Sequence, residues 1–137
     1  MQPSYKHYLK IIRNTCTGHE RPVTIPSEEL ADLARLAEDH CTVPFVLSSF
    51  RGTPFYPSML QRTRSMMLNY YQIDQFTRHT VSLLEDNGID CILLKGISLA
   101  SCYPVPEYRK LGDLDLYISR KSDISKAQKL LESHGYI

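Results

Sequence analysis

The stretch from Ser58 to Asp86 has no glycine or proline, and it constrains the fold more than any other part of the chain. Apolar and aromatic residues, with one threonine, recur along it at a three-four spacing, and charged residues fall between them. This period predicts one long amphipathic helix, or two helices in line, closed by Asn87-Gly88. The repeating positions, which we expect to pack in a core, are Met59, Met66, Tyr70, Ile73, Thr77 and Leu84.

Residues 1 to about 50 also carry helical signals, and prolines separate them. Ser27 is placed to cap a helix whose first turn holds Glu28 and Glu29. Helical spacing then continues at Leu30, Leu33, Ala34 and Ala37. We predict an N-terminal helical segment over residues 1–57, and the long helix with the elements after it over 58–137, together forming one compact unit.

The pattern changes after the long helix to short apolar segments that are typical of strands. Cys91-Ile-Leu-Leu-Lys95 predicts a buried strand, and Ile97 to Tyr103 can form a short helix before Pro104. In Asp113-Leu-Asp-Leu-Tyr-Ile118 the alternation is strict. We therefore expect the leucines and the isoleucine of that segment to face the core, while Asp113, Asp115 and Tyr117 share the opposite face.

The end of the sequence predicts a last helix capped by Ser122 and ended by Gly135. Tyr136-Ile137 looks like the beginning of a further strand. The predicted fold class is α+β, with N-terminal helices packed on a partial β-α-β-α core.

Charge and composition exclude several classes of function. Sixteen basic and fifteen acidic side chains nearly cancel, so the overall field does not steer the protein toward nucleic acid or a membrane, and phosphate recognition must be local. No apolar run approaches the ~20 residues that span a bilayer, and Lys10 and Arg13 interrupt the N-terminal apolar residues, so we expect a cytoplasmic protein.

We expect free thiols at the four cysteines, although Cys16, His19, His40 and Cys41 are ligand types that zinc accepts.

Gly112-Asp-Leu-Asp115 is the string that carries the most chemical information. Two carboxylates at positions i and i+2 of a strand project side by side from one face, where their charges repel. A hard cation such as Mg²⁺ relieves this repulsion, and ions held in this way stabilise phosphoryl and nucleotidyl transfer. Taken alone, Asp-x-Asp on a half-exposed strand is more often a solvated face, so its context matters.

That context is a series of short motifs in fixed order: Leu93-Leu-Lys-Gly-Ile-Ser-Leu-Ala100, Tyr103-Pro-Val-Pro106, Arg109, Gly112-Asp-Leu-Asp-Leu116 and Gly135-Tyr136. From about residue 60 to residue 137 the chain resembles the bacterial family of uncharacterised nucleotidyltransferases, within the polymerase-β-like nucleotidyltransferase superfamily. The resemblance implies the first part of the catalytic domain only.

The resemblance also implies roles for single residues. Asp113 and Asp115 would be the catalytic carboxylates that bind Mg²⁺ or Mn²⁺, while Lys95, Gly96, Ser98 and Arg109 would bind the phosphates of the NTP substrate. The superfamily's usual Gly-Ser or Gly-Gly pair is replaced here by Gly96-Ile97, with Ser98 one position late. A strand-end lysine that reaches solvent explains Lys95 equally well, and a loop salt bridge explains Arg109.

A third carboxylate, which in the superfamily usually serves as the general base, is not visible in the sequence. Only Asp123 and Glu132 follow Asp115, and both fall in the predicted last helix. We therefore expect a fragment of a longer protein or a degenerate member of the family.

These observations leave two hypotheses for the function. The first is a nucleotidyltransferase that transfers a nucleoside monophosphate from an NTP to an unknown acceptor, which could be a small molecule, a protein or RNA, by a two-metal mechanism. Because no third carboxylate is visible, we expect this chain by itself to show little or no turnover. The alternative is a non-catalytic protein-interaction module with a relict nucleotidyltransferase core. The edge of an incomplete sheet would also favour a homodimer through that edge, and no membrane partner is expected.

Overall fold

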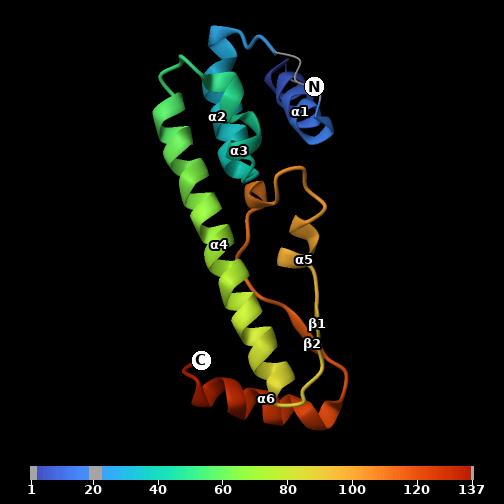
Figure 1. The fold of residues 1–137 in the computed structure, drawn as a ribbon. Coiled ribbons are helices and arrows are strands. Elements are labelled where there is room, and N and C mark those ends of the chain that lie inside the picture. Colours follow the sequence, from blue (N-terminus) through green and yellow to red (C-terminus); the bar gives the residue numbers. More distant parts are fainter. Residues whose placement is uncertain (1–2, 19–22, 137) are drawn as a thin grey trace. The chain divides into compact units, whose positions relative to one another are not determined.

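The computed structural model of the protein describes residues 3–18 and 23–136, and it is mostly helical (Figure 1). Contacts between residues divide the chain into two compact units. The first unit holds the described residues of Met1–Tyr70 and Ala100–Lys110, and the second those of Tyr71–Leu99 and Leu111–Ile137. The predicted division at residue 57 stays a prediction.

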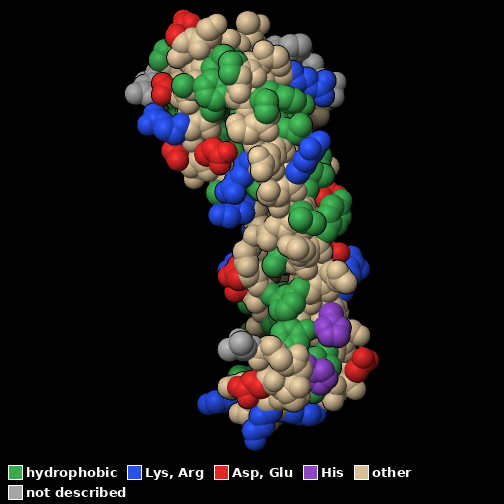
Figure 2. Space-filling model, turned by 90° about the vertical axis from the view of Figure 1, so that its left-hand side faces the viewer, with side chains coloured by type: hydrophobic (Ala, Val, Ile, Leu, Met, Phe, Trp, Pro, Cys, Tyr) green, Lys and Arg blue, Asp and Glu red, His purple; other side chains and the backbone are tan. Residues whose placement is uncertain are grey.

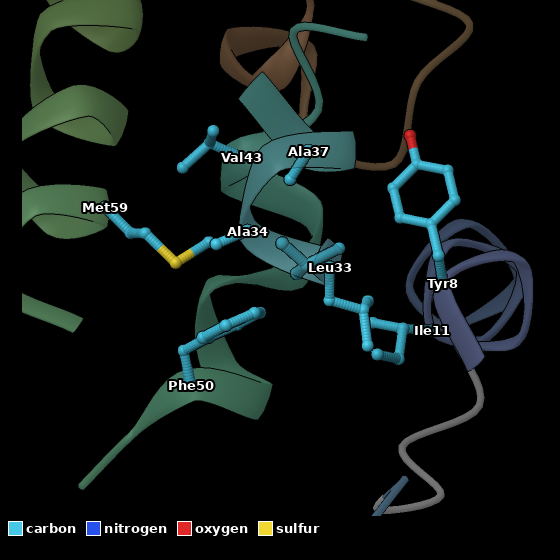
Figure 3. Packing of buried hydrophobic residues seen from close by; sticks show 9 residues of the cluster. Tyr8, Ile11, Leu33, Ala34, Ala37, Val43, Phe50 and Met59 are labelled. Atoms are coloured by element: carbon cyan, nitrogen blue, oxygen red, sulfur yellow. The ribbon is translucent and has the colours of Figure 1, made fainter. Parts of the chain in front are cut away.

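The first unit is built from short helices around an apolar core. The buried side chains include Tyr8, Ile11, Leu33 and Phe50, which Figure 3 shows close together. The elements of this unit are α1 (Pro3–Thr17), η1 (Ser27–Glu29), α2 (Leu30–Asp39), α3 (Val43–Val46), η2 (Leu47–Phe50), the first part of α4 (Tyr56–Asp86), and η3 (Pro106–Tyr108).

The start of α2 differs from the prediction, although the apolar face is as expected. Leu33, Ala34 and Ala37 are buried, which confirms their helical spacing. Ser27, however, does not cap the helix: it opens the 3₁₀ turn η1, and the N-cap of α2 is Glu29. The prediction was wrong because the chain after Pro26 first forms a tighter turn, so α2 begins only at Leu30.

The sequence predicted one long helix or two helices in line, and the structure has a single uninterrupted helix, α4. Met59, Met66, Thr77 and Leu84 are buried along one stripe, as the spacing predicts. The stripe also buries Thr63 and Thr80, which a pattern of apolar residues alone leaves out. Beyond Asp86, Gly88 adopts a left-handed φ of +68°, and the Ile89 N–H donates a hydrogen bond to the Leu84 carbonyl.

The second unit contains a small antiparallel sheet and the last helix. In this sheet β1 (Cys91–Leu93) pairs with β2 (Leu116–Ile118), with Ile92 opposite Tyr117. The helices of this unit are the rest of α4, most of α5 (Ile97–Ala100) and α6 (Lys121–Ser133). Leu84, Ile89 and Ala127 form its buried core, and Leu116 and Ile118 pack against them. The α+β class is confirmed, with fewer and shorter strands than expected.

β1 ends earlier and β2 begins later than predicted, for the same reason. After the Leu94 N–H has donated a hydrogen bond to the Asp115 carbonyl at 3.0 Å, the chain turns at Gly96, which has a φ of +51°. The segment around Asp113 therefore lies just before β2 rather than inside it. The face assignment holds where the strand is formed, because Leu116 and Ile118 are half-buried while Tyr117 is 51% exposed.

Three predictions for the second half of the chain need correction. Ser122 lies inside α6, whose N-cap is Arg120, because the extended backbone of Arg120 leads directly into the helix. The short helix after Gly96 ends at Ala100 rather than Tyr103, since the chain there continues as a turn. Tyr136 is not in a strand, and its ring lies beside Phe76 with 5.4 Å between ring centroids. Ile137 lies outside the described residues.

The surface agrees with the near-neutral composition. On the face drawn in Figure 2, basic and acidic side chains are scattered among hydrophobic and uncharged ones, and the formal net charge is +1. Within the described residues, no helix is both long enough and apolar enough to cross a membrane.

Candidate functional site

The turn that follows β1 positions Lys95. The backbone N–H of Ser98 donates a hydrogen bond to the Lys95 carbonyl at 3.0 Å, and the Ser98 hydroxyl donates a second one to the same oxygen at 2.6 Å. Between them Gly96 takes a left-handed conformation that L side chains rarely adopt. A Cβ built on Gly96 would lie 3.5 Å from the Asp113 carbonyl oxygen, so this turn packs against the backbone of the acidic segment.

The same region positions the two carboxylates. Because the Leu94 N–H bonds to the Asp115 carbonyl, Asp115 extends the ladder by one residue beyond β2 and is held directly opposite the end of β1. The Asp115 side chain is 30% exposed, whereas that of Asp113 is 74% exposed. Asp115 is therefore the more sheltered acid of the pair.

Lys95 joins the two acids. Its Nζ lies 2.6 Å from Asp115 Oδ2 and 3.7 Å from Asp113 Oδ2, so one ammonium group contacts both carboxylates. This agrees with the expectation that the two acids are close enough to share a cation. The sequence did not predict that a lysine of the chain would itself be that cation, because this contact depends on strand register. The available signal was the lysine placed at the end of the strand that pairs with the acidic segment.

The electrostatics of the cluster favour a charged lysine. The polar contact with Asp115, followed by the charges of Asp113 and Asp115, raises the pKa of Lys95 above its usual value. Asp115 Oδ2 is buried, and no described group gives it a hydrogen bond of suitable angle. The Lys95 ammonium lies 2.6 Å from this oxygen, which is the length of a charge-assisted hydrogen bond, but the two groups are not aligned as a hydrogen bond. The contact is therefore an ion pair.

The four predicted residues Lys95, Gly96, Asp113 and Asp115 are thus brought together in the second unit. Ser98 belongs to the same turn, but its hydroxyl bonds to the Lys95 carbonyl, and α5 is a single helical turn. Ser98 therefore stabilises the backbone conformation of Lys95 in this structure. The roles of these residues toward phosphate stay predictions.

Arg109 belongs to the first unit. Its guanidinium lies 5.7 Å from the centroid of the Tyr103 ring, and its Nη1 donates a 3.4 Å hydrogen bond to the Tyr103 hydroxyl. With Phe45 and Tyr108 these residues line a pocket of about 300 Å³. The predicted role of Arg109 in phosphate binding also stays a prediction.

No group of three or more histidine, cysteine or acidic side chains is placed to hold a metal ion in the described parts of the chain. The zinc alternative involved His19, which lies outside the described residues. Cys16, His40 and Cys41 are described and line the pocket next to Arg109, and all four cysteines are free thiols. The acidic pair at Lys95 is therefore the metal-binding candidate that the described residues offer.

Substitution of Gly96 tests the geometry of the turn. Gly96→Ala should lower the free energy of unfolding by about 1–2 kcal/mol, because alanine is strained at positive φ even though its Cβ has room. Gly112→Ala is a matched control, since Gly112 has no positive φ and no atom lies within 4 Å of the place that an alanine Cβ would take. Urea unfolding of the two variants should show the loss only for Gly96→Ala. Equal stability of both would contradict the strained turn.

The fold and this cluster define a helix-rich α+β protein in which an Asp-x-Asp pair faces a lysine at the end of a two-stranded sheet. Residues 26–137 match the model of a protein family described as uncharacterised nucleotidyltransferase, and the chain belongs to this family. The match confirms the predicted resemblance and begins further upstream than residue 60. Comparisons with curated proteins and with solved structures found no match. Membership in the family implies an NTP substrate and a divalent metal.

Proposed function

We propose that the protein transfers a nucleoside monophosphate from an NTP to an acceptor, and that Asp113 and Asp115 hold the divalent metal. The observation that carries this proposal is the convergence of both carboxylates on one cation. Lys95 Nζ lies 3.7 Å from Asp113 Oδ2 and 2.6 Å from Asp115 Oδ2. Family membership supports the nucleotide as substrate.

The donor set fits a hard divalent cation. Mg²⁺ and Mn²⁺ prefer carboxylate oxygens, and Asp115 Oδ2 is a buried oxygen that lacks a well-angled hydrogen bond among the described residues. A metal bound by the two acids would stabilise the negative charge on the transferring phosphoryl group. Lys95 is the cation next to it, and its ammonium can pair with phosphate oxygens of the same nucleotide.

In the proposed reaction the acceptor oxygen forms a bond to the α-phosphorus, and the bond from that phosphorus to the leaving pyrophosphate breaks. The acceptor hydroxyl gives its proton to solvent water, because no described residue is assigned as the base. Asp123 is paired with Arg120 at 3.0 Å, and Glu132 accepts a hydrogen bond from Gln128 at 2.8 Å. Both side chains therefore have structural partners on or beside α6.

The second candidate function is a non-catalytic protein-interaction module. Large apolar side chains are exposed along α4, with exposed fractions of 60% for Leu68, 52% for Tyr71 and 41% for Phe76. Exposed aromatic and apolar groups on one helix are a common feature of protein-binding surfaces. In this alternative the acidic pair has no role, so nucleotide experiments separate the two candidates.

The position of a radioactive label in the nucleotide tests the reaction type. Incubation with Mg²⁺ and cell extract as acceptor source should transfer label from α-³²P NTP to an acceptor, while γ-³²P should leave with pyrophosphate; the rate should be low, because no described residue is assigned as the base. The transfer should be lost in Asp115→Asn and kept in Glu132→Gln, an acid of α6 outside the cluster. Transfer of the γ-label would indicate a phosphotransferase instead. Transfer unaffected by Asp115→Asn would contradict the assigned site.

A further inference from the structure

We infer that Lys95 is an internal counter-cation that restrains metal binding: its ammonium occupies the place of the divalent ion, and a metal binds Asp113 and Asp115 only by displacing it. The inference rests on the proposed function, because it assigns a new role within the same site. It makes Lys95 the residue that sets the affinity for the metal when no nucleotide is bound.

The distances support this competition at the Oδ2 atoms of both acids. Lys95 Nζ lies 2.6 Å from the buried Oδ2 of Asp115, while Mg²⁺ binds oxygen at about 2.0–2.1 Å, so ion and ammonium cannot both occupy the space in front of that atom. The ammonium also repels a dication a few ångströms away. The 3.7 Å contact with Asp113 places the same group against the second proposed ligand.

The backbone of Lys95 is fixed while the end of its side chain is accessible. Ser98 donates two hydrogen bonds to the Lys95 carbonyl, and the ladder bond at Leu94 holds the preceding residue opposite Asp115. The Lys95 side chain is nevertheless 60% exposed, and a lysine stem has four rotatable carbons. The ammonium can therefore leave the carboxylates by rotation of its side chain, with no change in the strands.

This arrangement couples metal binding to nucleotide binding. A metal that enters without nucleotide must break the ion pair and leave the ammonium without a partner. When an NTP arrives with the metal, the triphosphate supplies a new anionic partner for Lys95. The site should therefore hold a divalent ion weakly alone and more tightly together with a nucleotide.

The test is a Mn²⁺ titration without nucleotide, in which the electron paramagnetic resonance signal reports free Mn²⁺. Lys95→Met keeps the apolar stem and removes the charge, and it should bind Mn²⁺ roughly ten- to thirty-fold more tightly than the wild type. Lys95→Arg retains the charge and should bind as the wild type does. The double variant Asp113→Asn with Asp115→Asn should not bind at this site, and thermal unfolding of each variant verifies that it is folded.

The outcomes separate the inference from the proposed function. Unchanged or weaker Mn²⁺ binding by folded Lys95→Met, together with binding by the wild type that the double variant loses, overturns the counter-cation role and leaves the metal site intact. Equal tightening by Lys95→Met and Lys95→Arg also overturns it, because charge would then not be the cause. If neither the wild type nor Lys95→Met binds Mn²⁺, both the inference and the metal site fail.

Discussion

Phe50→Ala should lower the free energy of unfolding of the first unit by about 3–5 kcal/mol. Phe50 is completely buried at the end of η2 and belongs to the core that Figure 3 shows, together with Leu33 and Met59. The Phe55 ring approaches it edge-on, with 6.3 Å between centroids. Removing the ring therefore eliminates buried apolar area and an aromatic contact, and it leaves a cavity that the surrounding helices can close only in part.

Leu68→Ala is the control for this substitution. Leu68 is also a large apolar residue but is 60% exposed on α4, so its truncation should change stability by less than about 0.5 kcal/mol. Urea unfolding followed by circular dichroism would compare both variants with the wild type. A midpoint for Phe50→Ala as high as that for Leu68→Ala would contradict the described core.

Residues with strong periodicity were the ones that the sequence predicted well. The long helix, its buried stripe and the left-handed Gly88 that follows its end at Asp86 are explained by spacing and by backbone freedom, which are local properties. The predictions that Ser27 and Ser122 cap helices were wrong, because several neighbouring positions can open a helix and tertiary packing selects among them. The burial of Thr63 and Thr80 on α4 shows the same limit of the sequence. Tertiary packing decides which threonines are buried, and a pattern of apolar residues does not indicate them.

The site was predictable in its residues but not in its contacts. Alternation and the Asp-x-Asp string indicated that Asp113 and Asp115 lie close together, and family membership gave them a function to be tested. The ion pair with Lys95 arises from the register of β1 against β2, which places Leu94 opposite Asp115. Register is determined by long-range pairing, so the position of Lys95 at the end of its strand indicated a residue near the acidic segment but not the contact itself.

Removal of both negative charges is the second substitution for which we expect a large effect. Asp113→Asn with Asp115→Asn should eliminate the gain in NTP affinity that Mn²⁺ provides to the wild type, which we expect to be on the order of a hundredfold. Asparagine keeps the shape of each side chain, while a neutral amide oxygen is a much weaker ligand for a hard dication. The fold should be kept, because Lys95 and Asp113 are largely exposed, where ion pairs contribute little to stability, and asparagine keeps the shape of the more sheltered Asp115 side chain.

The most direct test of the central claim is calorimetric titration of each NTP into the wild type, with and without Mn²⁺, beside the same titrations of this double variant. Glu132→Gln serves as the matched control, since it removes an acid of the same unit outside the cluster. We predict that Mn²⁺ strengthens nucleotide binding to the wild type and to Glu132→Gln but not to the double variant. Equal strengthening in all three proteins would show that Asp113 and Asp115 do not hold the metal.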